Sequence, residues 1–423
     1  MARKITKETL TYGSIVPLIG GENLGIMKTL DGRLPEWVLS YTPFAENDKH
    51  FISYLRGTKD WKGSYDFVDE KPEGWKPKKK VDVVNTVCPC AGLSSLSTTS
   101  SADSAVNEWM YKTAEYVLGT ISPQVFWGEN APRLFSTGGK KVADRLHDIG
   151  RRYGYSLNLY FTKSRLHGIP QKRPRTFYFF VKDDRAPLFR YVQRDVVPVE
   201  KILKMADKKS DKMNILVNAE KPMDNPWVAY CVEKTGGKTL LDYYNHITES
   251  RNFIWAATED FPGTNLEEVA KWMEEKGFDE RFPRRARAMK AKMDDNKGFW
   301  GHGVTMPKGV IPSLIGAMPN SIINPFKERY LTIRDCLRIM GMPDDFDLAT
   351  DKPLRDVNHI CQNVPVSTAS DMMEFVIDYL EGRTDTAGGT YVRQSNANHR
   401  HDVDESCFEN QTADLFGEVE ASK

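Results

Sequence analysis

Two of the six cysteines stand one residue apart, at Cys88 and Cys90, directly after the apolar run of residues 81–87. A metal site needs about four ligands, which usually come in pairs, but the other cysteines stand alone. A redox pair normally has two intervening residues at a helix start, and here only Pro89 intervenes. Two interpretations are left: two buried cysteines at a strand end, or a nucleophile held on a tight turn.

The residues after Cys90 favour the nucleophile. Gly92, two residues later, allows the backbone to turn sharply and to approach a ligand closely. The apolar run predicts a strand, and open α/β folds bind ligands at the carboxyl edge of the parallel sheet. We therefore expect Cys90 to be an exposed nucleophile, while Cys88 still belongs to the strand.

Strands and helices alternate along the first 185 residues. Residues 9–30 predict a strand, a turn at Gly20-Gly21 and the start of a helix. Further strands are expected at residues 38–45, 81–87, 124–128, 156–161 and 176–181, and helices at residues 108–118 and 141–153. This order predicts an α/β fold with a parallel, doubly wound sheet.

The alternation stops near residue 185, and a charged region follows. It contains a lysine-rich stretch over residues 201–212 and a basic cluster over residues 281–292. Helical patterns return at residues 332–340 and 368–380, and the chain becomes polar beyond Gly382. We predict a first domain over residues 1–185, an inserted domain over 186–323, closing helices over 324–383 and a disordered tail over 384–423.

Bulk composition leaves the partner open. The net charge of +1 neither demands nor excludes a polyanion, because a basic face can be balanced by acids elsewhere. No apolar run is long enough to cross a membrane, and the first residues lack the apolar core of a signal peptide. We therefore expect a cytoplasmic protein with reduced cysteines and no membrane partner.

Four segments, in order, resemble motifs of the DNA cytosine-5 methyltransferases. The first is V-C-P-C-A-G-L-S at residues 87–94, which is similar to the catalytic motif G-x-P-C-Q-G-F-S. The others are W-G-E-N-A-P at 127–132, G-I-P-Q-K-R-P-R-T-F-Y-F at 168–179 and N-P-F-K-E-R-Y-L-T-I-R-D-C-L-R-I-M-G-M-P-D-D-F at 324–346. The resemblance covers roughly residues 9–185 and 320–380. It implies a Rossmann-like methyltransferase sheet with the insert as target recognition domain.

The resemblance also implies roles for the motif residues. Cys90 would add to C6 of cytosine and so make C5 electron-rich enough to accept a methyl group. Glu129 would act as an acid beside ring N3, and Arg175, with Arg173 behind it, would hold the O2 side of the ring and the phosphates. The target atom lies inside the duplex stack, so the base must be flipped out. The plainer alternatives are a salt-bridged carboxylate for Glu129 and a solvated basic strand end for the arginines.

The implied methyl donor is S-adenosylmethionine. The P-L-I-G-G turn stands where the family has a glycine-rich loop, an acid after the second strand would bind the ribose, and C-Q-N-V-P-V resembles the motif that closes over the donor. Asp66 would meet the adenine amine, with Asp69 as its rival. The expected donor contacts are Val16, Ile19, Gly20, Gly21, Glu46, Asn47, Asp66, Pro89, Asn363 and Val364.

Duplex DNA is the implied partner of a monomer that works without a metal, and a cognate restriction enzyme is left open as a second partner. The expected DNA contacts are Ser94, Gln171, Arg284, Arg285 and Arg287. Gln171 would also brace its loop. The lysines of residues 201–212 are interpreted as a solvated face.

Some residues depart from the family pattern. Ala91 replaces a glutamine, and Val16 and Leu18 replace an aromatic residue and a glycine. These departures leave an altered donor pocket open. Two alternatives therefore stand beside the leading hypothesis: the same chemistry on RNA or a free cytosine nucleotide, and a catalytically inactive DNA-binding relative.

Overall fold

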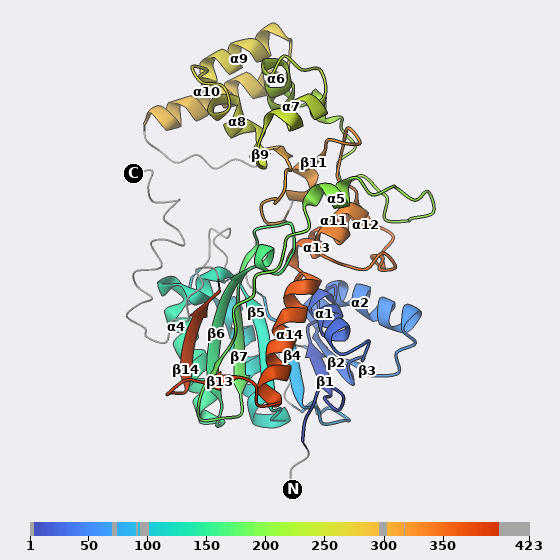
Figure 1. Cartoon of the computed structure of the whole chain (residues 1–423), viewed down its shortest axis with the longest axis vertical. Coiled ribbons are helices and arrows are strands. Elements are labelled where there is room, and N and C mark those ends of the chain that lie inside the picture. Colours follow the sequence, from blue (N-terminus) through green and yellow to red (C-terminus); the bar gives the residue numbers. More distant parts are fainter. Residues whose placement is uncertain are drawn as a thin grey trace.

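The computed structural model describes residues 4–69, 74–89, 92–93, 101–295, 303–316 and 318–396. Within these residues a sheet of eight strands forms the centre of the molecule, in the order β14-β6-β7-β5-β4-β1-β2-β3 (Figure 1). Only β7 runs antiparallel to its neighbours β5 and β6. The strands are β1 (Tyr12–Ile15), β2 (Trp37–Tyr41), β3 (Ser64–Val68), β4 (Val83–Val87), β5 (Val125–Asn130), β6 (Ser156–Lys163), β7 (Pro174–Val181) and β14 (Tyr391–Ser395). The predicted α/β sheet is confirmed.

Helices cover both faces of the sheet, and neighbouring residues of β2 show this directly. Ser40 donates a hydrogen bond to Asp48 of α2, whereas the Tyr41 hydroxyl meets Thr113 of α3 at 2.7 Å. Because successive side chains of a strand point to opposite faces, α2 and α3 lie on opposite sides. The helices around the sheet are α1 (Gly21–Thr29), α2 (Ala45–Thr58), α3 (Glu108–Tyr116), α4 (Lys140–Arg152) and α14 (Val366–Leu380).

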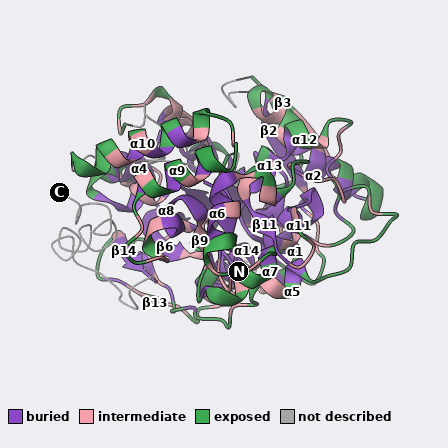
Figure 2. Ribbon diagram, turned by 90° about the horizontal axis from the view of Figure 1, so that it is seen from above, coloured by how far each residue is buried: buried purple, intermediate pink, exposed green. Residues whose placement is uncertain are grey.

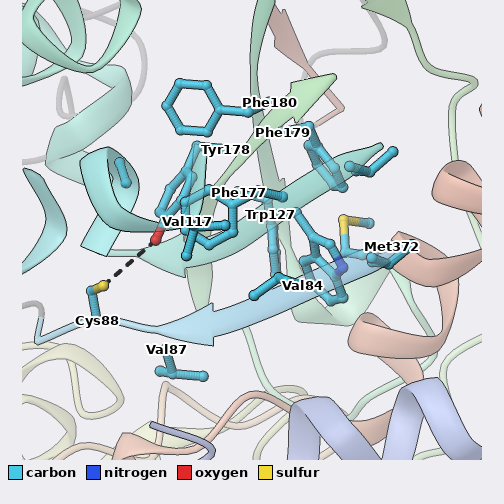
Figure 3. Packing of buried hydrophobic residues seen from close by; sticks show 14 of the residues in the cluster. Val84, Val87, Cys88, Val117, Trp127, Phe177, Tyr178, Phe179, Phe180 and Met372 are labelled. Carbon is cyan, nitrogen blue, oxygen red and sulfur yellow. Dashed lines mark hydrogen bonds between the residues drawn. The ribbon is translucent and has the colours of Figure 1, made fainter. Parts of the chain in front are cut away.

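The middle of the sheet is buried on both faces. All five residues of β4 are buried, as expected for a central parallel strand. Aromatic rings of β5 and β7 stack across the strands. The ring centroids of Trp127 and Phe179 (both in Figure 3) are 5.8 Å apart, and those of Phe126 and Phe180 are 5.7 Å apart. This packing fixes the register of the strand ends that carry the candidate site.

The second predicted strand is too long. We expected it to reach residue 45, but β2 ends at Tyr41, a short 3-10 turn with Pro43 follows, and α2 begins at Ala45. Proline lacks an N–H for a strand ladder and favours the first turn of a helix. Glu46 and Asn47 therefore lie in the first turn of a helix and not at a strand end.

The expectation of a disordered tail from residue 384 is wrong for residues 385–395. Strand β13 (Asp385–Thr386) pairs with β8 (Pro187–Leu188), and β14 pairs in parallel with β6 at the edge of the central sheet. Polar side chains are buried in β14, and Gln394 accepts hydrogen bonds from Asn158 and from the Phe189 amide. A strand so rich in buried polar groups lacks the apolar pattern that predicts a strand.

The insert holds a helical bundle with its own hydrophobic core at one end of the molecule (Figure 1). Its helices are α6 (Pro226–Lys234), α7 (Leu240–His246), α8 (Phe253–Glu259), α9 (Leu266–Glu275) and α10 (Arg281–Asp294). Phe189 and Val192 pack in the core of the central sheet, so the separate packing of the insert starts later than the predicted boundary at residue 186.

A second core joins the first half of the sheet to the closing helices α11 (Ile333–Ile339) and α13 (Asn358–Gln362), and it also takes in α5 (Val199–Leu203). The short helix α12 (Pro353–Asp356) lies between α11 and α13 in the sequence. Strands β9 (Arg251–Asn252) and β10 (Thr305–Met306) pair within the insert. Strand β11 (Ile323–Asn324) pairs with β12 (Arg329–Tyr330), which precedes α11. None of the helices in the described residues is both long and apolar enough to span a membrane.

Candidate active site at the carboxyl edge of the sheet

The turn after β4 leads from a buried cysteine toward the candidate nucleophile. Cys88 is 3% exposed, and its sulfur lies 3.7 Å from both the Tyr178 hydroxyl and Thr86 Oγ1 (Figure 3). Burial raises the pKa of the Cys88 thiol, which disfavours the thiolate that a nucleophile needs. Cys90, Ala91 and Ser94 lie outside the described residues. Cys88 is therefore a packing residue, and it lies just beyond β4, which ends at Val87, and not within the strand as predicted.

Glu129 and Arg175 meet at the neighbouring strand ends. Glu129 stands next to Val87 and opposite Phe177 in the sheet register. Residues 175 and 177 face the same side of β7, and the Arg175 guanidinium forms an ion pair with the Glu129 carboxylate. The side chains of Glu129 and Arg175 are 3% and 14% exposed. The sheet thus holds an acid and a guanidinium together, almost shielded from solvent, at its carboxyl edge.

Asn130 connects this pair to the turn after β4. Its side-chain oxygen accepts from the Ala131 amide at 2.8 Å, and its Nδ2 lies 3.5 Å from the Pro89 carbonyl. These contacts agree with the expectation that Asn130 shapes the turn. Pro89 and Glu129 are therefore neighbours at the same edge.

Arg173 does not face a substrate, which corrects our expectation. It is 1% exposed, and its guanidinium donates to the carbonyls of Leu314, Cys361 and Asn363 at 2.9, 2.9 and 2.6 Å. The backbone at Arg173 has a positive φ of 28°, so the strand pattern has not yet begun there and the side chain turns inward. Arg173 joins the start of β7 to the closing segment of the chain.

Gln171 is also buried, so the expectation of a DNA contact is not met. Its side-chain oxygen accepts from the Leu314 amide at 3.2 Å, and its nitrogen lies 2.9 Å from the sulfur of Met340. The expectation that it braces its loop fits these contacts.

The first glycine turn closes against the Asn363-Val364 segment. The Gly21 amide donates to Asn363 Oδ1 at 2.8 Å, and a Cβ on Gly21 would stand 2.1 Å from the Val364 carbonyl. Gly20 has φ of 92° and no space for a Cβ beside Phe51. The two segments that we predicted to hold the donor therefore lie side by side.

Val16 and Leu18, in the same loop, have φ of 50° and 53°. This left-handed region is costly for residues with a side chain, above all for a β-branched one. The loop therefore keeps the path of a glycine-rich loop although it lacks two of the expected residues. Ile19 lies between them and the glycine pair and is fully buried.

The polar residues predicted to bind the donor do not gather in one place, unlike the first glycine turn and the Asn363-Val364 segment. Glu46 is exposed and pairs with Lys49 at 2.6 Å, and Asn47 donates to Gln362 at 2.7 Å. Asp66 lies inside β3, level with Leu39 of β2. Its rival Asp69 lies just beyond the end of β3 and accepts from Thr42 at 3.2 Å, so the geometry favours Asp69 at the carboxyl edge.

Two buried acids near the donor loop were not predicted. Asp48 is fully buried and accepts from Ser40, and Glu22 is fully buried and accepts from Asn85 Nδ2 at 3.1 Å. Burial raises the pKa of both carboxyls well above the ordinary range. The only signal in the sequence is their position in the first turn of a helix, where acids are common for other reasons.

A cluster of His50, Asp356 and His359 places three possible ligand atoms within 4.8 Å of one another. The Ala349 amide donates to His50 Nδ1 at 2.9 Å, so the ring proton of neutral His50 is on Nε2, 3.2 Å from His359 Nδ1. Burial lowers the pKa of His50 to about 4. A protonated Nε2 cannot ligate a metal, and Asp356 is already paired with Arg355 at 2.7 Å. We interpret the cluster as a hydrogen-bonded contact between α2 and α13.

The predicted DNA contacts of the insert divide into two kinds. Arg284 and Arg285 are exposed on α10. Arg287 instead pairs with Glu267 and Glu274 of α9, at 3.1 and 2.6 Å. These carboxylates already neutralise Arg287, so it does not fit the role of a phosphate contact.

Comparisons with known proteins agree with this geometry. Residues 14–377 match the family described as C-5 cytosine-specific DNA methylase. The Type II methyltransferase M.MthTI of Methanothermobacter thermautotrophicus is 23% identical over 327 residues, which are 74% of this chain and 85% of that protein.

Among solved structures, a protein described as a DNA modification methyltransferase encoded within an E. coli prophage superposes with a TM-score of 0.53 at 15% identity. The match covers 88% of this chain and 99% of that one, and at this identity it supports the fold alone. The family match spans most of the sequence, from β1 to α14. The chain therefore belongs to the C-5 cytosine-specific DNA methylases, the enzymes that methylate cytosine in DNA.

Proposed function

We propose that the chain transfers a methyl group from S-adenosylmethionine to C5 of a cytosine flipped out of duplex DNA, with Cys90 as the nucleophile. The observation that carries the proposal is the Glu129–Arg175 ion pair at the ends of β5 and β7. It lies beside the turn that leads from Pro89 into Cys90. The proposal requires that the Cys90 thiolate reach a base held by this acid and guanidinium.

Each residue type fits a demand of the reaction. C5 of cytosine is a weak nucleophile, and addition of the Cys90 thiolate to C6 makes the ring electron-rich. Negative charge then builds at N3, where Glu129 shares a proton with the ring. After the methyl group moves to C5, loss of the C5 proton to a base and elimination of the Cys90 thiolate from C6 restore the ring and free the enzyme. Arg175 orients the Glu129 carboxyl and directs its other N–H groups to the O2 side of the ring. The shielding of both side chains strengthens these interactions relative to water.

The residues of the first loop fit an adenosyl-type donor. The Gly20-Gly21 turn brings bare backbone to the carboxyl edge, and Asn363 fixes it through the Gly21 amide. Val16, Ile19, Val364 and Pro89 would line this cradle, and Asp69 and Glu46 are the acids that would meet the polar groups of the donor. S-adenosylmethionine supplies an electrophilic methyl group when it is bound.

Duplex DNA is the substrate that the insert supports. A free nucleotide needs no separate recognition domain, whereas the helical bundle presents exposed Arg284 and Arg285. Because the catalytic edge lies on the sheet and not on a protruding element, the target base must leave the stack to reach it.

The similarity to a Type II methyltransferase favours a modification enzyme, which works as a monomer on DNA beside a cognate restriction enzyme.

The test is transfer of a labelled methyl group from S-adenosylmethionine to duplex DNA, RNA and free dCMP, assayed in parallel. Cys90→Ala should abolish label at cytosine C5. The matched control Cys88→Ala removes the neighbouring buried thiol and should keep most of the activity. Label in RNA or dCMP alone would change the substrate, and equal activity in Cys90→Ala would overturn the mechanism.

A further inference from the structure

The outward face of α10 carries arginines that are not neutralised by the protein. Figure 2 shows exposed positions along α10, and the exposed residues are Arg281, Arg284, Arg285, Ala288, Ala291 and Lys292. At 100° per residue, these positions fall on one side of the helix. No ion pair of Arg284 or Arg285 is found among the described residues, so both guanidinium groups are available to a partner.

The opposite side of α10 fixes the helix to the bundle. Pro283, Ala286 and Met289 are buried, and the last two belong to the core of the insert. Arg287 holds α9 through Glu267 and through two bonds of 2.6 and 2.9 Å to Glu274. A helix anchored in this way presents its exposed side chains in a rigid frame.

The shape of the outward face suits a groove and not a flat surface. Ala288 and Ala291 leave its centre shallow, so the backbone of α10 can approach a surface closely. A helix of this kind fits the major groove, which is about 12 Å wide. In the groove, arginine makes the commonest specific contact, two hydrogen bonds to O6 and N7 of guanine.

Arg281 differs from its neighbours although it lies on the same face. Its guanidinium lies 4.8 Å from the centroid of the Phe282 ring and 3.8 Å from the Asp279 carboxylate. These contacts hold it near the start of the helix. Arg284 and Arg285 are thus the two arginines free to reach base edges.

We propose that α10 is a recognition helix that enters the major groove beside the target cytosine and reads guanine through Arg284 and Arg285. The inference rests on the proposed action on duplex DNA and adds to it the element, the groove and the base. It adds base recognition to the sequence-based expectation that Arg284 and Arg285 contact DNA.

The experiment uses a duplex library with random bases around one cytosine, methylated by the full-length enzyme and read by bisulfite sequencing. The parent should prefer guanine at fixed positions near the methylated cytosine. Arg284→Gln and Arg285→Gln should each lose about tenfold or more of the preference at one guanine position. Arg281→Gln, the matched control on the same face, should keep every preference.

Binding measured against salt separates base contacts from phosphate contacts. A phosphate contact would weaken binding equally on all sequences and reduce the slope of log K against log salt by about 1, with guanine preference intact. That result in both variants would overturn the recognition helix while leaving the proposed function standing. A parent enzyme that neither binds nor methylates duplex DNA would overturn both, and thermal melts of the exposed variants check that the bundle stays folded.

Discussion

Arg173 and Arg175 lie two residues apart but have different roles, one structural and one in the candidate active site. The positive φ at Arg173 turns its side chain into the interior, where it holds the Leu314, Cys361 and Asn363 carbonyls. Arg175 is already in the strand and faces Glu129. The motif predicts both arginines as substrate contacts, because sequence spacing does not tell where the strand register begins.

This difference predicts separable effects of substitution. Arg173→Met leaves buried carbonyls without a donor and should lower the free energy of unfolding by about 3 kcal/mol or more. Arg175→Lys keeps a positive charge beside Glu129 and should unfold close to the parent, but lose about tenfold or more of its turnover, since an ammonium lacks the planar fork. Urea unfolding and methyl-transfer rates measure the two effects, and a stable Arg173→Met would contradict the structural role.

Glu22 predicts a pH dependence of stability. Burial, opposed by the hydrogen bond from Asn85 and supported by the charge of Glu129, raises the Glu22 pKa well above the ordinary 4.5. The unfolded chain then loses this proton near pH 4.5 while the folded chain keeps it. The contribution of Glu22 therefore lowers the free energy of unfolding further as pH rises above 4.5, until the pH passes the Glu22 pKa in the folded protein.

Glu22→Gln mimics the protonated acid and removes this cost. The melting temperature of the variant minus that of the parent should increase from pH 5 to pH 8. The exposed Glu46→Gln is the control, because the Lys49 hydrogen bond lowers the Glu46 pKa and its contribution has the opposite sign. A constant difference across this range would show that Glu22 is already ionised in the folded protein.

At the scale of elements, apolar strands were predictable and polar ones were not. Strands β1, β4, β5, β6 and β7 follow from their apolar runs, and the Glu129–Arg175 pair follows from motif residues at two strand ends. The start of α2 depends on the turn at Pro43, which moved Glu46 from a strand end into a helix. The edge strand β14 depends on tertiary partners such as Asn158, which no local pattern reveals.

The edge strand predicts a sharp limit for truncation. Ending the chain after Arg383 removes β14, exposes the edge of β6 and leaves Asn158 and the Phe189 amide without Gln394. Exposed strand edges promote aggregation, so this variant should melt several degrees lower and lose solubility. Ending the chain after Asn396 keeps the β14 contacts seen within the described residues and should melt like the parent. Equal melting of the two truncations would show that β14 contributes little.

At the scale of the whole molecule, the candidate site depends on two cores and target recognition on a third. The core of the central sheet carries the strand ends with Glu129 and Arg175, and the second core joins α1 and α2 to the closing helices. The helical bundle of the insert packs around separate residues, among them Val269, Ala286 and Met289. The shift from alternating strands to charged segments predicts such an insert, but it does not predict that the insert is helical.

Separate cores predict that donor binding survives loss of the bundle. Ala286 is fully buried in α10, whereas Ala219 is exposed and precedes the first helix of the bundle. Ala286→Asp places an unpaired charge in the core of the insert, which costs several kcal/mol, and should reduce helical circular dichroism and abolish DNA binding. Because the contact between Gly21 and Asn363 lies in the other cores, calorimetric binding of S-adenosylhomocysteine should stay within about twofold of the parent.

Ala219→Ser, at an exposed position outside the helical bundle, is the control and should change neither property. If Ala286→Asp lost donor binding together with DNA binding, the three cores would fold as one unit, and the insert would support the catalytic edge as well as the target. Retained donor binding would mean that the bundle acts only in recognition, and that its basic helix can be altered to change sequence preference without loss of the donor cradle.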